Sequence, residues 1–437
     1  MSEKVLTSSS PQKISFQTAI AIVIANMIGA GVFTSLGYQA LGLPSSFPLL
    51  LLWLVGGIVA LCGALSYGEL AAMFPRSGGE YNYLSQIYHP AYGFLSGWVS
   101  ATVGFAAPVA LAAMALGRYA NSVSEMIHPQ VIAIIVVLVL SIIHSISINT
   151  GSIFQRYSTA IKVALIFFLI IAGFTLSTNA QVVNVVPQEG DWSLVFSSSF
   201  AISLAFVSFS YSGWNASAYL ATEIDNPKKN VPRSLLLGTA LVMGAYILLN
   251  FVFLYTVPIE ELAAKQGADI STPLEVGYLS ANVIFGTLGG KIMGALIALL
   301  LVSSISSMVF AGPRVTQVMG EDIPLLGKLA KKSVNGLPVY AIVLQSTISI
   351  TLILTTSFDA VLYAIAFILD LFTFSTVLGV FIMRIREPKR ERIYAAWAYP
   401  LSPAIFLLAT GWTMYFLLTE RTKESLIALA LVLLGLL

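Results

Sequence analysis

Charged residues and cysteine are both scarce in this chain. Asp, Glu, Lys and Arg make up 10% of the 437 residues, whereas hydrophobic residues make up 57%, a balance that excludes a soluble globular domain of this size. The single cysteine, Cys62, excludes an internal disulfide framework. A net charge of +2 predicts no nucleic-acid partner. The composition predicts an all-α polytopic membrane protein.

The patterns of nucleotide and metal chemistry are also absent. The sequence has no P-loop, so hydrolysis of ATP by this chain is excluded as a driving force. The three histidines, His89, His128 and His144, have no partners at the spacing of metal ligands. We therefore expect no metal and no cofactor. No set of nucleophile, base and acid can be assembled, which predicts no catalytic residues and no enzyme.

Long apolar runs dominate the chain instead. A membrane-spanning helix needs roughly 17–25 apolar residues, and about twelve such helices are expected. They lie near 17–37, 48–74, 93–120, 130–149, 157–176, 194–221, 233–257, 290–312, 339–357, 359–383, 395–418 and 425–437. The last run is short. Residues 258–289 are too interrupted to span and predict short helices on the outer face.

The distribution of Lys and Arg predicts the orientation. With twelve spans, sixteen of the 22 basic residues fall on the side of the N-terminus and five on the other, while Lys162 falls inside the fifth helix. Positive charge concentrates in cytoplasmic loops. The sequence therefore predicts a multi-pass protein of the cytoplasmic (inner) membrane with a cytoplasmic N-terminus.

The first and the sixth runs are interrupted near their middle, by IGAGVF at 28–33 and FSYSGW at 209–214. Glycine weakens a helix, and a pair of interrupted helices in matching halves is typical of transporters with inverted repeats. We expect an N-terminal tail (1–16), a first five-helix repeat (17–176), an external loop (177–193), a second, inverted five-helix repeat (194–383), a basic cytoplasmic loop (384–394), and the eleventh and twelfth helices (395–437).

The interruptions predict a site for the backbone of an amino acid. The N–H groups of Ala30 and Gly31 would be freed at the positive end of a half-helix, which suits a carboxylate. The carbonyl groups of Met27, Phe209 and Ser212 would be freed as acceptors for an ammonium. The alternative is that the glycines only permit close packing of helices.

Several segments resemble the amino acid-polyamine-organocation (APC) superfamily, with a sixth helix most similar to its L-type amino acid transporter branch. They are GAGVF at 29–33, FSYSGWN at 209–215, TEIDNPKKNVPR at 222–233, YGEL at 67–70 and PRSGGEY at 75–81. The resemblance implies a leucine-transporter-like fold of 5+5 inverted repeats, alternating access and amino acid transport. It places carboxylate contacts on Ala30 and Gly31, amine contacts on the three carbonyl groups above, and an aromatic that closes over substrate on Phe209. Core packing is the alternative for Phe209.

Lys162 is the most informative charge, because a lysine inside a membrane helix is a functional candidate. In sodium-coupled transporters of this fold, carbonyls of the first helix and hydroxyls of the eighth bind Na⁺. The resemblance implies that Lys162 places its ammonium there instead. Its distance of about 9 Å from Arg156 along the helix leaves snorkelling to the cytoplasmic face open. Hydroxyls suited to a sodium site are present in the eighth helix, at Ser303, Ser304, Ser306 and Ser307.

Two acidic residues complete the candidate set. Asp370, in the middle of the tenth helix, could bind a cationic side chain, relay a proton, or be protonated and hydrogen-bond to a neighbouring helix. Glu69 lies near a cytoplasmic helix end beside basic loops. We expect Glu69 to contribute to an inner gate or to a structural ion pair, and not to bind substrate.

Together these features predict a sodium-independent secondary active transporter of neutral L-amino acids, working by alternating access through proton symport or exchange. An exchanger of cationic amino acids or polyamines using Asp370 is the alternative, and a membrane amino acid sensor is an alternative of a different class. Expected partners are an L-amino acid, the lipid bilayer and, for symport, protons. No disulfide-linked ancillary subunit is expected, because residues 121–130 have no cysteine where eukaryotic L-type members carry one.

Overall fold

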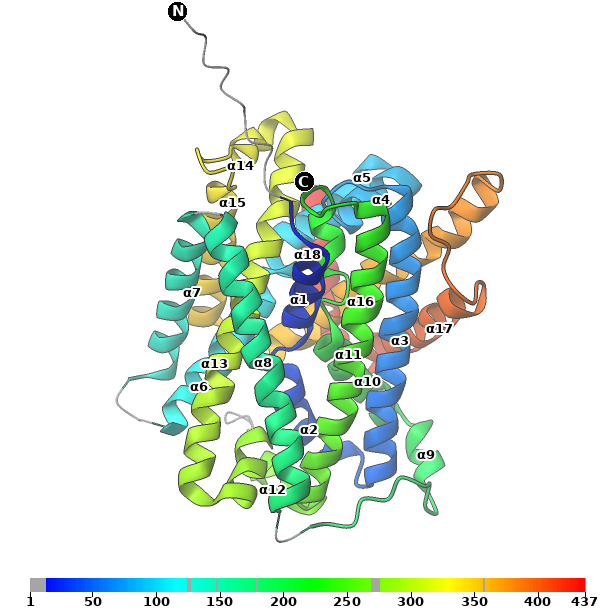
Figure 1. The fold of residues 1–437 in the computed structure, drawn as a ribbon. Coiled ribbons are helices and arrows are strands. Elements are labelled where there is room, and N and C mark those ends of the chain that lie inside the picture. Colours follow the sequence, from blue (N-terminus) through cyan, green and yellow to red (C-terminus); the bar gives the residue numbers. More distant parts are fainter. Residues whose placement is uncertain are drawn as a thin grey trace, which may run out of the picture.

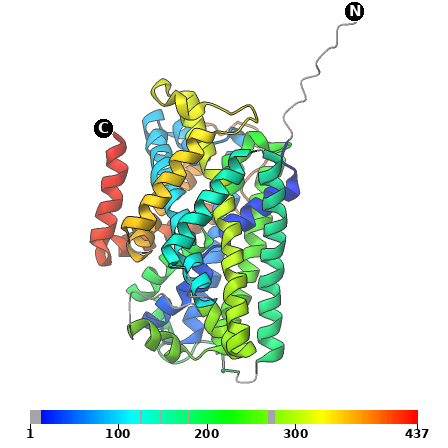
Figure 2. The same ribbon diagram turned by 90° about the vertical axis from the view of Figure 1, so that its left-hand side faces the viewer.

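A computed structural model describes residues 13–123, 127–146, 148–177, 180–268, 276–356 and 358–436. Within these ranges the chain is helical, and the only extended pairing is an isolated parallel bridge between Ile14 and Ile224. The helices form one bundle, and the first and last described residues, 13 and 436, lie towards the same end of it (Figures 1 and 2). That end is called the N-side below.

Eighteen α-helices follow one another along the described residues. The α-helices are α1 (Phe16–Met27), α2 (Gly31–Gly42), α3 (Ser46–Met73), α4 (Glu80–Ile87), α5 (Pro90–Val99), α6 (Ala106–Val123), α7 (Pro129–Ile146), α8 (Ile148–Leu176), α9 (Asp191–Val195), α10 (Ser198–Tyr211), α11 (Pro227–Thr256), α12 (Ile259–Ala268), α13 (Val276–Asp322), α14 (Gly327–Ala330), α15 (Val339–Thr355), α16 (Phe358–Arg386), α17 (Leu401–Glu420) and α18 (Thr422–Leu433). A π-helix, η1 (Ser100–Gly104), joins α5 to α6, and 3₁₀-helices form η2 (Ala216–Glu223), η3 (Pro324–Leu326) and η4 (Leu434–Leu436).

The helices of the described residues have the length and composition of membrane spans. Nine stretches are long and apolar enough to cross a bilayer, namely Phe16–Gly42, Ser46–Met73, Pro90–Asn121, Pro129–Ile146, Tyr157–Leu176, Pro227–Thr256, Val276–Asp322, Val361–Arg386 and Leu401–Glu420. The remaining predicted runs form the shorter helices α10, α15 and α18. The chain is an all-α polytopic membrane protein, as its composition predicts.

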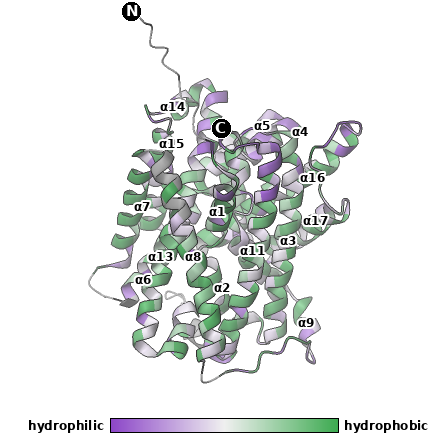
Figure 3. Ribbon diagram, viewed as in Figure 1, coloured by the Kyte–Doolittle hydropathy of each residue, from purple (hydrophilic) through white to green (hydrophobic). Residues whose placement is uncertain are grey.

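Apolar residues colour the flanks of the bundle, while polar residues gather at the N-side around α4 and α5 (Figure 3). The interrupted stretch 258–289 forms α12 and the first part of α13, which is kinked at Gly286, where φ is 73°. The core of the bundle holds the two interrupted helices. α1 packs against α8, α11 and α13, and α10 packs against α2 and α3.

Candidate substrate-binding site

The first membrane helix is interrupted where the glycine-rich segment predicts. α1 ends at Met27, residues 28–30 are not helical, and α2 begins at Gly31. Ile28 leaves the helical conformation with a ψ of 92°. The first N–H groups of α2 have no acceptor within their own helix, and they lie at the positive end of its dipole. This end of α2 can therefore bind an anionic group.

The sixth membrane helix is interrupted in the same way. α10 ends at Tyr211, Ser212 is extended with a ψ of 151°, and the chain resumes as the 3₁₀-helix η2. Between them Gly213 has a φ of 93°, a conformation that L side chains rarely adopt. The carbonyl oxygen of Phe209 accepts the N–H of Ser212 at 3.0 Å, so one of the three predicted amine acceptors already has a partner.

The two interruptions are in direct contact. A Cβ added to Gly31 would lie 2.3 Å from Ser210 Oγ and 2.9 Å from Ser210 Cα, and one added to Gly213 would lie 2.8 Å from the carbonyl carbon of Asn26. The close approach of Ser210 thus leaves no room for a side chain at Gly31. Gly29 is different, because the nearest atom to its added Cβ is the Met27 carbonyl oxygen, at 3.9 Å. A Cβ at Gly29 would thus make only an ordinary van der Waals contact.

Tyr246 of α11 holds the interruptions together from one side. Its hydroxyl lies 2.7 Å from the carbonyl oxygen of Met27 and 3.0 Å from that of Ser210, both within donating distance. The hydroxyl is fully buried with the rest of the side chain. The Met27 carbonyl, predicted as a free acceptor, thus lies against this hydroxyl, although a carbonyl oxygen has a second lone pair.

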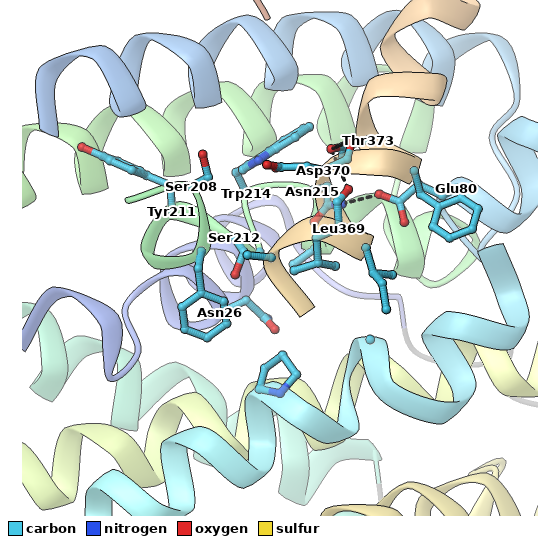
Figure 4. A pocket seen from close by; sticks show the side chains of 18 of the residues that line it. Asn26, Glu80, Ser208, Tyr211, Ser212, Trp214, Asn215, Leu369, Asp370 and Thr373 are labelled. Carbon is cyan, nitrogen blue, oxygen red and sulfur yellow. Dashed lines mark hydrogen bonds between the residues drawn. The ribbon is translucent and has the colours of Figure 1, made fainter. Parts of the chain in front are cut away.

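A cavity lies beside the interruption of the sixth helix (Figure 4). Of the predicted site residues, Phe209, Ser212 and Asp370 line it together. Met27, Ala30 and Gly31 are buried and do not belong to its lining, to which the first helix contributes Asn26. The π-helix η1 and the residues around it contribute Ser96, Val99, Ser100, Gly104, Phe105 and Pro108. Such π segments recur at functional sites.

Lys162 reaches the interruption of the first helix from α8. Its side chain is fully buried, and its Nζ donates to the carbonyl oxygens of Ala25 at 3.1 Å and Ile28 at 2.7 Å and to Ser304 Oγ at 2.8 Å. The snorkelling alternative is therefore wrong for this structure. Three oxygen acceptors match the three N–H donors of an ammonium group, and Ser304 also donates to the Ile28 carbonyl.

The other serines of this part of α13 have different partners. Ser303 bonds to Ser158 at 3.2 Å, Ser306 to Nε2 of His144 at 2.7 Å, and Ser307 to the carbonyl oxygen of Ser304 at 2.8 Å. Among these four serines, only Ser304 hydrogen-bonds to Lys162 in the described part of the chain. The serines of this segment therefore serve contacts between helices as well as the site of Lys162.

Asp370 lies in α16 with 8% of its surface exposed. Its Oδ2 atom has no hydrogen-bond partner among the described residues. Thr373, one turn further on, donates to the carbonyl oxygen of Leu369 at 2.8 Å. One alternative from the sequence is a protonated Asp370 that hydrogen-bonds to a neighbouring helix. The Oδ2 atom makes no such bond among the described residues.

Glu80, at the start of α4, is a second acidic residue of the cavity lining. Its Oε1 accepts from Tyr67 at 2.6 Å and from Asn215 at 2.9 Å, and its Oε2 accepts from Tyr219 at 2.8 Å. Burial raises the pKa of Glu80, while these three hydrogen bonds oppose the increase. Glu80 therefore joins α3 to the η2 end of the interruption of the sixth helix.

Glu69 forms an ion-pair cluster at the N-side end of α3. Its side chain is 1% exposed and accepts from Arg384 at 3.0 and 2.7 Å, from Arg392 at 3.1 Å and from the backbone N–H of Ala396 at 2.7 Å. Glu69 thereby fixes the end of α16 and the loop that follows it. It does not line the cavity.

A backbone connection closes the N-side between the two interrupted helices. The N–H of Ile14 donates to the carbonyl oxygen of Glu223 at 2.7 Å, and the N–H of Asp225 donates to the carbonyl oxygen of Ile14 at 3.0 Å. Glu223 also pairs with Arg314 of α13 at 3.1 Å. The segment before α1 and the end of η2 are thus held together.

Two interrupted membrane helices in contact, with a cavity beside them, define a membrane transporter and not an enzyme. The model of the amino acid permease family matches residues 14–437, and the chain belongs to this family of the APC superfamily, with relatives in its L-type branch. Amino acid transport follows from this membership.

Named relatives cover most of the chain. The serine/threonine exchanger SteT of Bacillus subtilis (strain 168) is 28% identical over 434 residues, which are 97% of this chain and 95% of that protein. The b(0,+)-type amino acid transporter 1 of Homo sapiens is 28% identical over 410 residues, 89% of this chain and 81% of that protein. The large neutral amino acids transporter small subunit 2 of Homo sapiens is 26% identical over 443 residues, which are 97% of this chain and 79% of that protein.

Proposed function

We propose that this chain is a sodium-independent secondary active transporter of L-amino acids, with neutral amino acids as its principal substrates, and that it works by alternating access. The observation that carries the proposal is the position of Lys162. Its ammonium lies among two carbonyl oxygens of the first helix, Ala25 and Ile28, and a hydroxyl of α13, Ser304. Oxygen atoms of this kind are the ligands that a sodium ion requires, so a fixed positive charge replaces the ion.

The substrate backbone binds at the two interruptions in this proposal. Its carboxylate accepts from the N–H groups of Ala30 and Gly31 at the start of α2, and its ammonium donates to carbonyl oxygens of Met27, Phe209 and Ser212. Phe209 and Ser212 line the cavity, which supports the ammonium side. The lack of a close contact beside Gly29 among the described residues supports the approach of a carboxylate to the start of α2.

The transporter's two halves, 17–176 and 194–383, are related by inversion in this proposal, and residues 395–437 lie outside the repeat. The N-side faces the cytoplasm, where Glu69 and the backbone connection at Ile14 belong to the inner gate. Exchange is favoured over proton symport by the name of the Bacillus subtilis relative. No disulfide-linked subunit takes part, since Cys62 is 7% exposed within α3.

Uptake of radiolabelled amino acids into proteoliposomes tests the proposal. We expect uptake that requires internal amino acid and is unaffected when sodium is replaced by choline. Uptake driven by a proton gradient without internal amino acid would replace exchange by symport. A strict requirement for sodium would contradict the role of Lys162, and the absence of uptake of any amino acid would contradict the proposed function itself.

A further inference from the structure

Asp370 is the acidic residue of the cavity whose hydrogen bonding is incomplete. With 8% of its surface exposed, it lines the same cavity as Phe209 and Ser212, and its Oδ2 has no hydrogen-bond partner among the described residues. Figure 4 draws it with Ser212 and Asn215 around this cavity. A buried carboxylate oxygen without a partner is costly, which indicates that its partner is a ligand of the cavity.

The second carboxyl group of the cavity does not have this property. Glu80 accepts from Tyr67 and Asn215 through one oxygen and from Tyr219 through the other. All three donors are neutral groups of the protein. The two acidic residues therefore differ, because Glu80 is occupied by the fold and Asp370 is open to the cavity.

The lining carries no positive charge to balance these acids. Among the described residues that line the cavity, none is Lys, Arg or His. Lys162 is not part of the lining, and three protein oxygens already accept from its Nζ. A cavity with two acids and no base binds a cation better than a neutral or anionic group, since charge inside a region of low dielectric requires a counter-charge.

No structural partner of Asp370 Oδ2 is found among the described residues. Leu369, Phe372 and Phe406 are apolar members of the lining, and the Thr373 hydroxyl donates to the Leu369 carbonyl oxygen. In the described part of the chain, the nearby residues thus leave this carboxylate oxygen without a donor.

We propose that Asp370 receives the cationic end of a substrate side chain, an ammonium or a guanidinium, so that the transporter also accepts cationic L-amino acids such as lysine and arginine. This inference rests on the proposed function, because the substrate's own ammonium and carboxylate are placed at the two interruptions. The side chain then extends from the interruption of the sixth helix towards α16. Polyamines share the cationic end but lack the carboxylate, and so they serve to separate the two contributions.

The test compares lysine with leucine in proteoliposomes that contain the full-length chain or its Asp370→Asn variant. Asparagine keeps the shape of the side chain and removes its charge. The ratio of KM for lysine to KM for leucine is expected to rise by about tenfold or more in Asp370→Asn, as expected for loss of a charge-assisted hydrogen bond. Glu420→Gln removes an exposed negative charge at the end of α17 and is expected to change this ratio by less than about twofold.

Each result separates the inference from the proposed function. Leucine uptake by the original chain without lysine uptake or inhibition by lysine overturns the inference and leaves the proposed function in place. An unchanged ratio in Asp370→Asn, with a flattened pH profile for leucine, overturns it in favour of a proton-binding role. Inhibition by a polyamine as strong as inhibition by lysine also overturns it, because a substrate bound at the interruptions needs its carboxylate. If Asp370→Asn loses leucine uptake, the ratio of the affinities for lysine and leucine is measured without transport, from the thermal stabilisation of the purified protein by each amino acid.

Discussion

Lys162 Nζ of α8 lies 2.7 Å from the carbonyl oxygen of Ile28, at the point where the first membrane helix is interrupted. The contact joins residues that are 134 positions apart. It satisfies a carbonyl group that the interruption leaves without a helical partner, and it does so with a positive charge. The interruption and the lysine therefore depend on each other.

Replacing Lys162 by methionine is expected to reduce leucine uptake by at least about tenfold, roughly 1.4 kcal/mol. Methionine keeps the length of the side chain but cannot donate to Ala25, Ile28 or Ser304. Proteoliposome uptake measures the change, and size-exclusion chromatography checks the fold. Lys291→Met, at an exposed lysine of α13, is the matched control and is expected to retain uptake. Full activity of Lys162→Met would remove the lysine from the mechanism.

We expect alanine to affect stability at one glycine of the GAG segment, Gly31, and substrate binding at the other, Gly29. In Gly31→Ala the added methyl group meets Ser210, so we expect a loss of stability of about 1–3 kcal/mol, visible as a lower Tm in detergent. In Gly29→Ala the methyl group makes only an ordinary van der Waals contact, 3.9 Å from the Met27 carbonyl oxygen, and it lies at the proposed carboxylate site.

We therefore expect Gly29→Ala to keep its Tm in the absence of substrate and to raise the KM for leucine by about tenfold or more. Gly31→Ala serves as the comparison, because it separates packing from binding. A Gly29→Ala variant with the original KM would place the substrate carboxylate away from the start of α2.

Tyr246→Phe tests whether a single hydroxyl holds the two interruptions in place. Without it, the carbonyl oxygens of Met27 and Ser210 lose a buried donor, which costs about 1–3 kcal/mol. Thermal unfolding in detergent measures the loss. Tyr415→Phe, at a side chain that is 60% exposed, provides the control and should leave Tm unchanged. Equal Tm values for both variants would mean that the hydroxyl of Tyr246 contributes nothing to stability.

Removing the carboxylate of Glu69 is expected to destabilise the N-side strongly. Glu69→Ala leaves the partly buried guanidinium groups of Arg384 and Arg392 without their partner, and breaking a buried ion pair costs about 3–5 kcal/mol. Glu387→Ala breaks a more exposed pair with Arg390 and should cost less than about 1 kcal/mol. Thermal unfolding of both variants gives the comparison, and similar values would contradict the structural role of Glu69.

The sequence predicted features that depend on local physical chemistry. The apolar runs gave the membrane class, because hydrocarbon requires long apolar helices. The glycines at 29, 31 and 213 gave the interruptions, because the cost of glycine in a helix is a property of the residue itself. The family resemblance pointed to Lys162 and to the backbone groups around the interruptions.

Contacts between segments that are distant in the chain could not be predicted from the sequence. Tyr246 and Glu80 carry no local signal that distinguishes them from other buried polar residues, and both acquire their roles from partners on other helices. The direction of the Lys162 side chain was also open, since position along a helix does not say which neighbour the side chain meets. The packing of α8 against α1 and α13 decided it.

Gly29 and Gly31 illustrate the difference between what the sequence determines and what the tertiary structure decides. The sequence by itself determined that the first helix is interrupted there, because both residues lower the cost of leaving the helical conformation. Only the tertiary structure decided that Gly31 is packed against Ser210 while an added side chain at Gly29 would meet no close contact. The physical reason is that conformational preference belongs to a residue and its immediate neighbours, whereas the space around it is set by segments that the chain brings together only when it folds.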